Sequence, residues 1–238
     1  YYGFTAYVNS IQMADTITAT YHYGDGLTVE ETYSVKQYIE LFEDNMNLFD
    51  DETVALIKSL ADYGHYVQPF LANVRNWTIG TDYAEMDKFF TEVYDYETVT
   101  NAVADFAIVR ELGTEVTKIN YSLSLDSATG IYVYFTPVTG YNGSIVAKID
   151  GEEVTPEWEE NAARYLVEIA NISAHELGKT YEVTFETDNS EAVCRVSTMS
   201  YVQGVLNAAA YASDTTAKNA VSALYCYYKA ADEYKQAH

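Results

Sequence analysis

Histidine, the side chain most often used in catalysis, is sparse and scattered in this chain. The histidines are His22, His65, His175 and His238. None has a neighbour at the spacing of a metal site or a catalytic triad, and the sequence contains no phosphate-binding loop and no Gly-x-Ser-x-Gly turn. Carboxylates are abundant enough that a close pair such as Glu157 and Glu159 arises by chance. The sequence therefore predicts a protein that is not an enzyme and needs no cofactor.

Oxygen-bearing side chains gather in the segment 44–52, which reads Asp-Asn-Met-Asn-Leu-Phe-Asp-Asp-Glu. The segment lacks the glycine and the ligand spacing of a calcium-binding EF-hand loop. Asp50 precedes a run with helical periodicity, the position where a carboxylate accepts hydrogen bonds from the first turn. We interpret the segment as a turn between two helices with Asp50 as a cap, and we expect no metal site.

A sugar site needs a flat aromatic ring for the apolar face of the pyranose, with amide and carboxylate groups nearby for the hydroxyls. Trp77 lies in a turn-rich stretch beside such groups. The candidate ligand-binding residues are Trp77, Arg75, Asn76, Asp82 and Tyr83. The alternative is that Trp77 fills the space between helices and a sheet.

Two further aromatic residues are secondary candidates for such a site. Trp158 stands in an acidic stretch that we expect to be a loop, either as a second platform or, as we favour, as a lid over the end of a sandwich. Tyr141, followed by Asn and Gly, is a weaker candidate for a loop contact.

The charge balance narrows the classes of partner. The chain has 13 basic and 36 acidic residues, a net charge of −23. It therefore repels the phosphate backbones of nucleic acids and anionic membrane surfaces, and we expect no nucleic-acid partner. No apolar run reaches the length of a membrane span, and we expect no membrane insertion. Because the sequence opens on Tyr1 rather than Met, we interpret it as a fragment of a longer precursor.

Two cysteines, Cys194 and Cys226, are too few for a disulfide scaffold and fit no zinc spacing. One falls in an expected strand and the other in an expected helix. They could form a disulfide in an oxidising compartment, but we favour two free thiols.

The elements that would position these residues show self-similarity at a shift of 164 residues. Segment 13–21 matches 177–185, and Leu60, Tyr63 and Phe70 match Leu224, Tyr227 and Tyr234. Between these anchors the register slips by about three residues, which sets Val35 and Tyr38 opposite Val202 and Val205. The sequence thus predicts an internal duplication.

Each copy is expected to be a β-hairpin followed by two helices. Alternating strands flank Gly24-Asp25-Gly26 in the first copy and Asp188-Asn189-Ser190 in the second. Helices are expected at about 34–46 and 200–211, each followed by a longer helix capped by Asp50 or Ser213. In the longer helices apolar residues recur by four and three, which is typical of a packing seam, and Pro69 should kink or end the first of them.

The region between the copies divides in two. Segment 73–112 carries the turn at Trp77 and two expected helices, 83–94 and 99–112. Beyond it, four segments alternate or run apolar, and with the second hairpin they predict a β-sandwich. These segments are 121–125, 130–135, 144–149 and 164–169.

The fold class that follows is α+β, a β-sandwich with helical hairpins and an internal duplication. The expected domains are a first repeat at 1–72, a helical or loop insertion at 73–114, and a third domain at 115–238 whose strands end in the second repeat.

Five segments carry a resemblance to a repeat module of large secreted cell-surface proteins of anaerobic, gut-dwelling Gram-positive bacteria. They are 14–20, 33–38, 60–64, 169–177 and 223–227. Related multi-domain proteins include starch-adherence proteins of the amylosome type, which hold α-glucans without cleaving them. The resemblance implies an extracellular, cell-surface location and neighbouring domains of a larger protein. It also implies a polysaccharide ligand, with α-glucan favoured; the rival is a structural or adhesive spacer without a sugar ligand.

Overall fold

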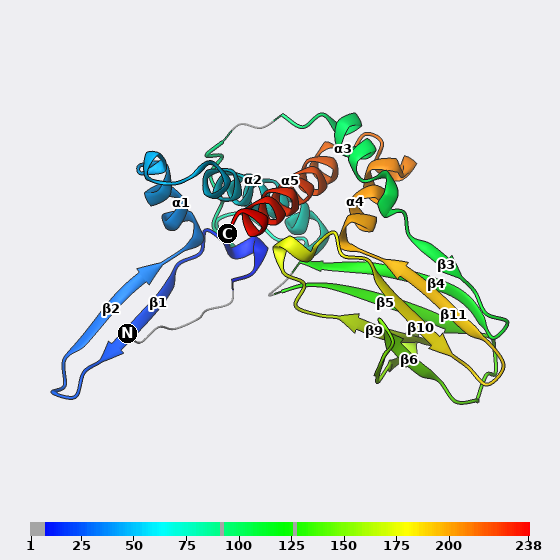
Figure 1. Cartoon of the computed structure of the whole chain (residues 1–238). Helices are drawn as coiled ribbons and strands as arrows, with labels where there is room; N and C mark the ends of the chain where they lie inside the picture. The colour runs from blue at the N-terminus through cyan, green and yellow to red at the C-terminus, as the bar shows by residue number, and fades with distance from the viewer. Residues whose placement is uncertain (1–7, 91–92, 126–127) are drawn as a thin grey trace. The chain divides into compact units, whose positions relative to one another are not determined.

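The structure is a computed structural model that describes residues 8–90, 93–125 and 128–238. Across these residues the chain forms five α-helices and three antiparallel sheets, so it is an α+β protein (Figure 1). It divides into two compact units, one made of 1–94 with 214–238 and the other of 95–213. These units cut across the domain boundaries expected from the sequence, because the last helix belongs with the first unit.

The first unit begins with a hairpin and two helices, in the order expected. Its elements are β1 (Ile17–His22), β2 (Thr28–Tyr33), α1 (Val35–Glu43), α2 (Asp51–Arg75) and α5 (Thr215–Ala237). The Ser34 hydroxyl caps α1 by accepting from Gln37 N, and Asp50 caps α2 by accepting from Thr53 N. The expected capping role of Asp50 is confirmed. The cap of α5 is Asp214, not Ser213, since Asp214 accepts from Ala217 N.

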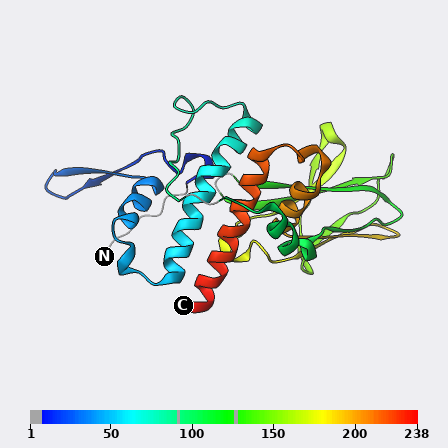
Figure 2. The same cartoon turned by 90° about the horizontal axis from the view of Figure 1, so that it is seen from above.

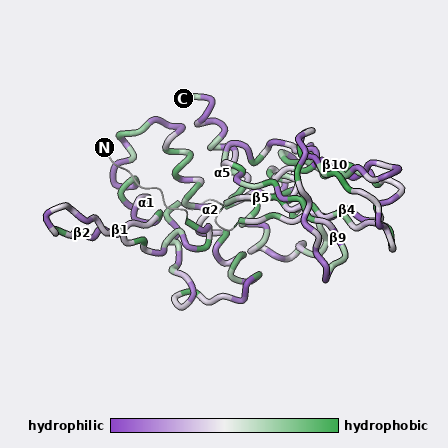
Figure 3. The backbone as a smooth tube through the Cα atoms, turned by 90° about the horizontal axis from the view of Figure 1, so that it is seen from below, coloured by the Kyte–Doolittle hydropathy of each residue, from purple (hydrophilic) through white to green (hydrophobic). Residues whose placement is uncertain are grey.

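α2 and α5 pack along one another, as both views show (Figures 1 and 2). Tyr63 of α2 stacks on Tyr227 of α5, with ring centroids 5.5 Å apart and planes 9° apart. Pro69 does not end α2, which continues to Arg75. Apolar and polar stretches alternate along the α2 backbone, so the helix presents a buried and a solvated side (Figure 3). Its buried side meets a cluster formed by Met13, Ile39, Phe42, Ile57, Ala61 and Met86.

The expected helix at 83–94 is wrong for its described residues, which hold no helix. Tyr83 and Met86 are buried, and Phe89 and Phe90 are partly buried, so the apolar residues of this segment pack without forming a helix. Backbone N–H groups of this segment donate to side chains elsewhere in the first unit. Ala84 N donates to Asp15 and Met86 N donates to Gln68. Tertiary contacts therefore override the local helical pattern.

The second unit contains two sheets. The five-stranded sheet has the order β3-β11-β10-β6-β7 and the four-stranded sheet the order β4-β5-β9-β8. The strands are β3 (Val109–Glu111), β4 (Val116–Leu125), β5 (Thr129–Pro137), β6 (Val146–Ile149), β7 (Glu152–Val154), β8 (Glu157–Glu159), β9 (Arg164–Ile169), β10 (Tyr181–Glu186) and β11 (Glu191–Val196). All four expected strand segments and the second hairpin are confirmed as strands. Residues 126–127, in the β4–β5 connection, lie outside the described part.

The two sheets of this unit touch through their aromatic side chains. Phe135 of β5 stacks on Phe185 of β10 with centroids 3.6 Å apart, and Tyr165 of β9 lies 6.3 Å from Phe185. Both phenylalanines are fully buried. The helices α3 (Tyr96–Ala102) and α4 (Thr198–Asn207) also belong to this unit. The expected helix at 99–112 is wrong: α3 ends at Ala102 and β3 occupies 109–111.

Cys194 is buried in β11 and Cys226 is half-buried in α5, and the two do not form a disulfide with each other. Burial raises the pKa of the Cys194 thiol to about 11, so it stays protonated and unreactive at neutral pH.

Candidate functional site

Trp77 directly follows the end of α2. Asn76 takes a left-handed conformation (φ 56°, ψ 42°), which asparagine tolerates better than most residues, and this turns the chain out of the helix. Trp77 N then donates to Ala72 O at 3.0 Å, closing the helix end. The indole is half-buried. It is therefore neither the fully exposed ring of a sugar platform nor a fully buried ring that fills the space between helices and a sheet.

Arg75 occupies one side of this indole. Its guanidinium carbon lies 5.0 Å from the centroid of the Trp77 ring, a cation–π geometry. A planar ligand is therefore left with the other face of the ring. The sequence placed Arg75 in the site as a hydrogen-bond donor, whereas the structure places it against the indole.

Asp82 organises the turn that follows. Its Oδ2 accepts from Thr78 N at 2.8 Å, and Gly80, at a φ of +82°, donates its N–H to Tyr83 O at 2.7 Å. Asn76 and Asp82 are both exposed on this turn. Part of the hydrogen-bonding capacity of Asp82 is thus used to shape the loop.

A hollow of about 370 Å³ lies beside Trp77. Its lining is Pro69, Ala72, Asn73, Trp77, Thr78, Ile79 and Tyr83. Tyr83 is only 4% exposed, and its buried hydroxyl has no hydrogen-bond partner among the described residues. Burial also raises the pKa of Tyr83. Of the five expected residues, Trp77 and Tyr83 line the hollow while Arg75, Asn76 and Asp82 do not.

The sequence reasoning missed the amide of Asn73, which lines the hollow. It stands on α2 one turn before Trp77, and helical spacing from the tryptophan could have found it. An indole, a phenol and an amide around one open hollow can stack on an apolar sugar face and bond a hydroxyl.

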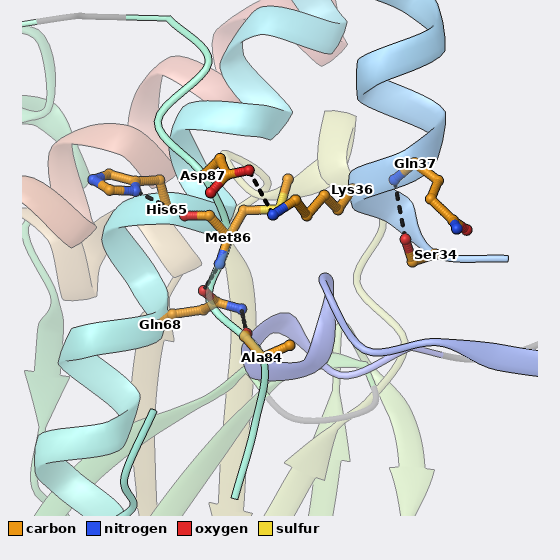
Figure 4. A network of polar contacts seen from close by, with 8 residues as sticks. All are labelled: Ser34, Lys36, Gln37, His65, Gln68, Ala84, Met86 and Asp87. Carbon is orange, nitrogen blue, oxygen red and sulfur yellow. Dashed lines mark hydrogen bonds and ion pairs between the residues drawn. The ribbon is translucent and has the colours of Figure 1, made fainter. Parts of the chain in front are cut away.

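The chain that follows the hollow is fixed to α2 by a polar network (Figure 4). The buried Gln68 amide donates to Ile11 O at 2.9 Å and to Ala84 O at 3.2 Å, and accepts from Met86 N at 2.6 Å. His65 Nδ1 lies 2.9 Å from Met86 O. An ion pair between Lys36 and Asp87 joins the same segment to α1. This network fixes the segment 84–87, which directly follows Tyr83, to α2 and α1.

Trp158 does not lie in a loop, which corrects the expectation from the sequence. It is in β8, where its Cα pairs with Tyr165 of β9 and the two rings lie 4.7 Å apart. Its Nε1 donates to Glu160 at 2.7 Å, and the residue is 41% exposed. The short strand was hidden in the sequence by its run of glutamates.

Tyr141 is used inside the second unit. Its hydroxyl donates to Ser144 O at 2.6 Å and accepts from Asp188 N at 3.2 Å. Ser144 bonds Asp188 in turn, so this cluster ties the loop at 141–144 to the hairpin turn. The tyrosine is half-buried and its hydroxyl is engaged.

A second hollow, of about 310 Å³, lies at the base of the first hairpin. Its lining is Val8, Ile17, Tyr33, Ser34, Val35, Tyr38 and Leu60. Most of these side chains are apolar, and Tyr33 and Tyr38 are exposed. The sequence reasoning did not anticipate this hollow, because its residues come from separate elements.

Within residues 8–90, 93–125 and 128–238, no group of three or more histidine, cysteine or carboxylate side chains is placed to hold a metal ion. Among the same residues, no helix has the length and apolarity that crossing a membrane requires. The chain matches no protein-family model, no curated protein and no solved structure.

Proposed function

We propose that this chain is a non-catalytic repeat module of an extracellular, cell-surface protein, built from two copies of one structural unit that space or anchor neighbouring domains. The element bounds support the duplication. β1 and β10 are related by a shift of 164 residues at both ends, and short 3₁₀ helices precede them at Ser10–Gln12 and Ala174–Glu176. The long helices begin 164 residues apart, at Asp51 and Thr215.

A tertiary hydrogen bond that occurs at equivalent positions in both copies carries the proposal. Lys36 N, in the first turn of α1, donates to Met13 O at 3.1 Å, and Met199 N, in the first turn of α4, donates to Leu177 O at 3.3 Å. The acceptors lie 164 residues apart and both side chains are buried. Such a bond between separate elements does not follow from local helix or hairpin propensity.

The helical caps refine the alignment. Ser34 and Ser197 cap α1 and α4 and lie 163 residues apart, so the register slips by one residue between the anchors, in place of the three suggested by the sequence. This alignment pairs Ile39 with Val202 and Phe42 with Val205, and all four are buried.

The matched positions in the long helices meet each other directly. Tyr63 and Tyr227 lie 164 residues apart in sequence and stack face to face. Leu224 is buried, whereas its counterpart Leu60 is half-buried and borders the apolar hollow. The contact is what two copies of one helix would make when packed through equivalent faces.

A β-sandwich in the second unit is the second part of the proposal. Its support is the aromatic contact between Phe135 and Phe185, which belong to different sheets. Rows of alternate residues in the strands around them are buried, as the two inner faces of a sandwich require.

Two assays test the mechanical role and the duplication. The full chain should neither bind immobilised starch and other polysaccharides nor release reducing ends from them. Binding, or release of reducing ends, would overturn the spacer function.

Ser34→Ala and Ser197→Ala should each lower the free energy of unfolding by about 1 kcal/mol, because each removes a helix cap. The buried Ser197, whose cap is reciprocal with Ser200, should show the larger effect. A change confined to one of the two variants would contradict equivalent units.

A second candidate, an α-glucan-binding module, is favoured by the hollow at Trp77. Trp77 and Tyr83 supply aromatic surface, and the Asn73 amide that lines the same hollow can bond a sugar hydroxyl. If starch is bound, Trp77→Ala should weaken binding at least tenfold, about 1.4 kcal/mol. Tyr23→Ala, which removes an exposed aromatic ring far from the hollow in sequence, is the control and should bind normally. Equal binding by Trp77→Ala would exclude this site.

A further inference from the structure

The loop between β5 and β6 contains Asn142-Gly143, the only asparagine in the sequence that is followed by a glycine. An asparagine in this position can lose ammonia, because the next backbone nitrogen reaches the side-chain amide carbon and closes a succinimide ring. Glycine favours the closure, since it has no Cβ to hinder the attacking nitrogen. Whether the ring forms in the folded protein depends on how the fold holds the two residues.

The fold leaves both reacting groups of this dipeptide free. Asn142 is exposed and lies outside the strands. Neither its side chain nor the Gly143 N–H makes a hydrogen bond with any residue that the structure describes. The residues on either side are held, since Tyr141 N donates to Val138 O at 3.1 Å and Ser144 N donates to Asp188 at 3.2 Å. The loop is thus anchored at both ends of an unbonded dipeptide.

Comparable residues elsewhere in the second unit are held by hydrogen bonds. The side-chain amide of Asn189 donates to Glu115 at 2.9 Å, and the backbone N–H of Asn189 donates to the same carboxylate at 3.0 Å. Asp150 also precedes a glycine, but its carboxylate accepts from Glu182 N at 2.9 Å. A side chain held in this way must first break its bond before it can form the ring, so the fold protects it. Asn142 lacks this protection.

We propose that Asn142 is a site of spontaneous deamidation in the folded protein. Gly143 N loses its proton to water and bonds to Cγ of Asn142, and the side-chain nitrogen leaves as ammonia. A water molecule then opens the ring. Opening at Cγ gives aspartate, whereas opening at the main-chain carbonyl gives isoaspartate, in which Gly143 stays bonded to Cγ. The reaction takes up one water and releases one ammonia for each chain, with no oxidant or reductant, and it depends neither on the duplication nor on a sugar ligand.

The surroundings of Gly143 indicate what the isoaspartate product does to the second unit. A Cβ at Gly143 would lie 2.0 Å from Oδ2 of Asp188 and 2.6 Å from the Tyr141 hydroxyl oxygen, so the loop backbone packs directly on the hairpin turn. Isoaspartate adds a methylene group to the main chain beside this contact. Because there is no room for a longer main chain unless Asp188 moves, the bonds from Ser144 to Asp188 should break.

Peptide mass spectrometry of the full chain, aged at mildly alkaline pH, tests the site. We expect Asn142 to convert to the acid within about tenfold of its rate in a chain unfolded by guanidinium chloride, and Asn189 to convert about a hundredfold more slowly when folded. If Asn142 stays an amide in the folded chain, or converts there as slowly as Asn189, the proposal is overturned.

Two glutamine variants provide the matched control. Asn142→Gln keeps an amide at the position but forms the ring much less readily, so it should stop the conversion. Asn161→Gln, at an exposed asparagine that precedes an alanine, should leave the conversion at 142 unchanged. Amide exchange then reports on the loop. The Ser144 amide should lose its protection in the aged parent chain and keep it in equally aged Asn142→Gln. Protection that survives complete conversion to isoaspartate would contradict the expected release of the loop.

Discussion

The two hairpins of this molecule share a design and differ in what surrounds them. Both alternate apolar and polar residues, and each precedes a serine-capped helix. β10–β11 lies inside a five-stranded sheet with a buried aromatic face, whereas β1–β2 forms a sheet by itself. The difference shows that alternation defines a face without deciding whether that face is buried, because burial depends on strands far away in sequence.

The largest expected effect comes from deleting the matched aromatic ring in each hairpin. Phe185→Ala should lower the free energy of unfolding by about 3–5 kcal/mol, since the ring is fully buried against Phe135. Tyr21→Ala should cost less than Phe185→Ala, because the Tyr21 side chain is only half-buried. Urea unfolding of both variants measures the contrast, and equal losses would mean that the first face is covered as well.

The first unit contains the buried polar network at Gln68, whereas the two sheets of the second unit meet through aromatic side chains. Gln68→Met keeps the side-chain volume but leaves Met86 N without its acceptor and two carbonyls without their donor. We expect a loss of about 2–3 kcal/mol. Gln37→Met, on the exposed side of α1, is the control and should stay within about 0.5 kcal/mol. If Gln68→Met left the free energy of unfolding unchanged, the Gln68 network would not be needed for stability.

The smallest effect concerns the hairpin turns and pH. Hydrogen bonds from Asn189 and Thr187 hold the pKa of Glu115 below its ordinary value. Because the folded pKa is lowered, the stabilisation is present above the unfolded pKa and is lost as pH falls through the folded one. The protection factor of the Asn189 amide should therefore fall in acid, while that of Gly26 in the first hairpin turn, whose amide donates to the Tyr23 carbonyl, should not follow it. Glu115→Gln should remove most of this dependence; an unchanged profile would contradict the assignment.

Local signals predicted much of the fold. Alternation identified both hairpins and the four strand segments, and the position of Asp50 before a periodic run identified its cap. The helix expected at 83–94 failed because its apolar spacing serves packing onto α2. β3, β7 and β8 are three residues each, too short to carry a periodic signal.

The candidate site was predicted only in part. The turn-rich stretch drew attention to Trp77, which the structure places beside a hollow that Tyr83 also lines. The roles of Arg75 and Asp82 could not be read from the sequence, because an arginine two residues from an indole can stack on it as readily as face a ligand. The apolar hollow at Tyr33 and Leu60 depends on packing between distant elements and left no local signal.

Amide hydrogen exchange on the full chain tests most directly whether the two-stranded sheet of the first hairpin is less stable than the five-stranded sheet that holds the second. The account predicts that the amides of β10 and β11 exchange only with global unfolding, and that those of β1 and β2 exchange at least hundredfold faster through local opening. Equal protection of the two hairpins in a chain shown by sedimentation to be monomeric would contradict it.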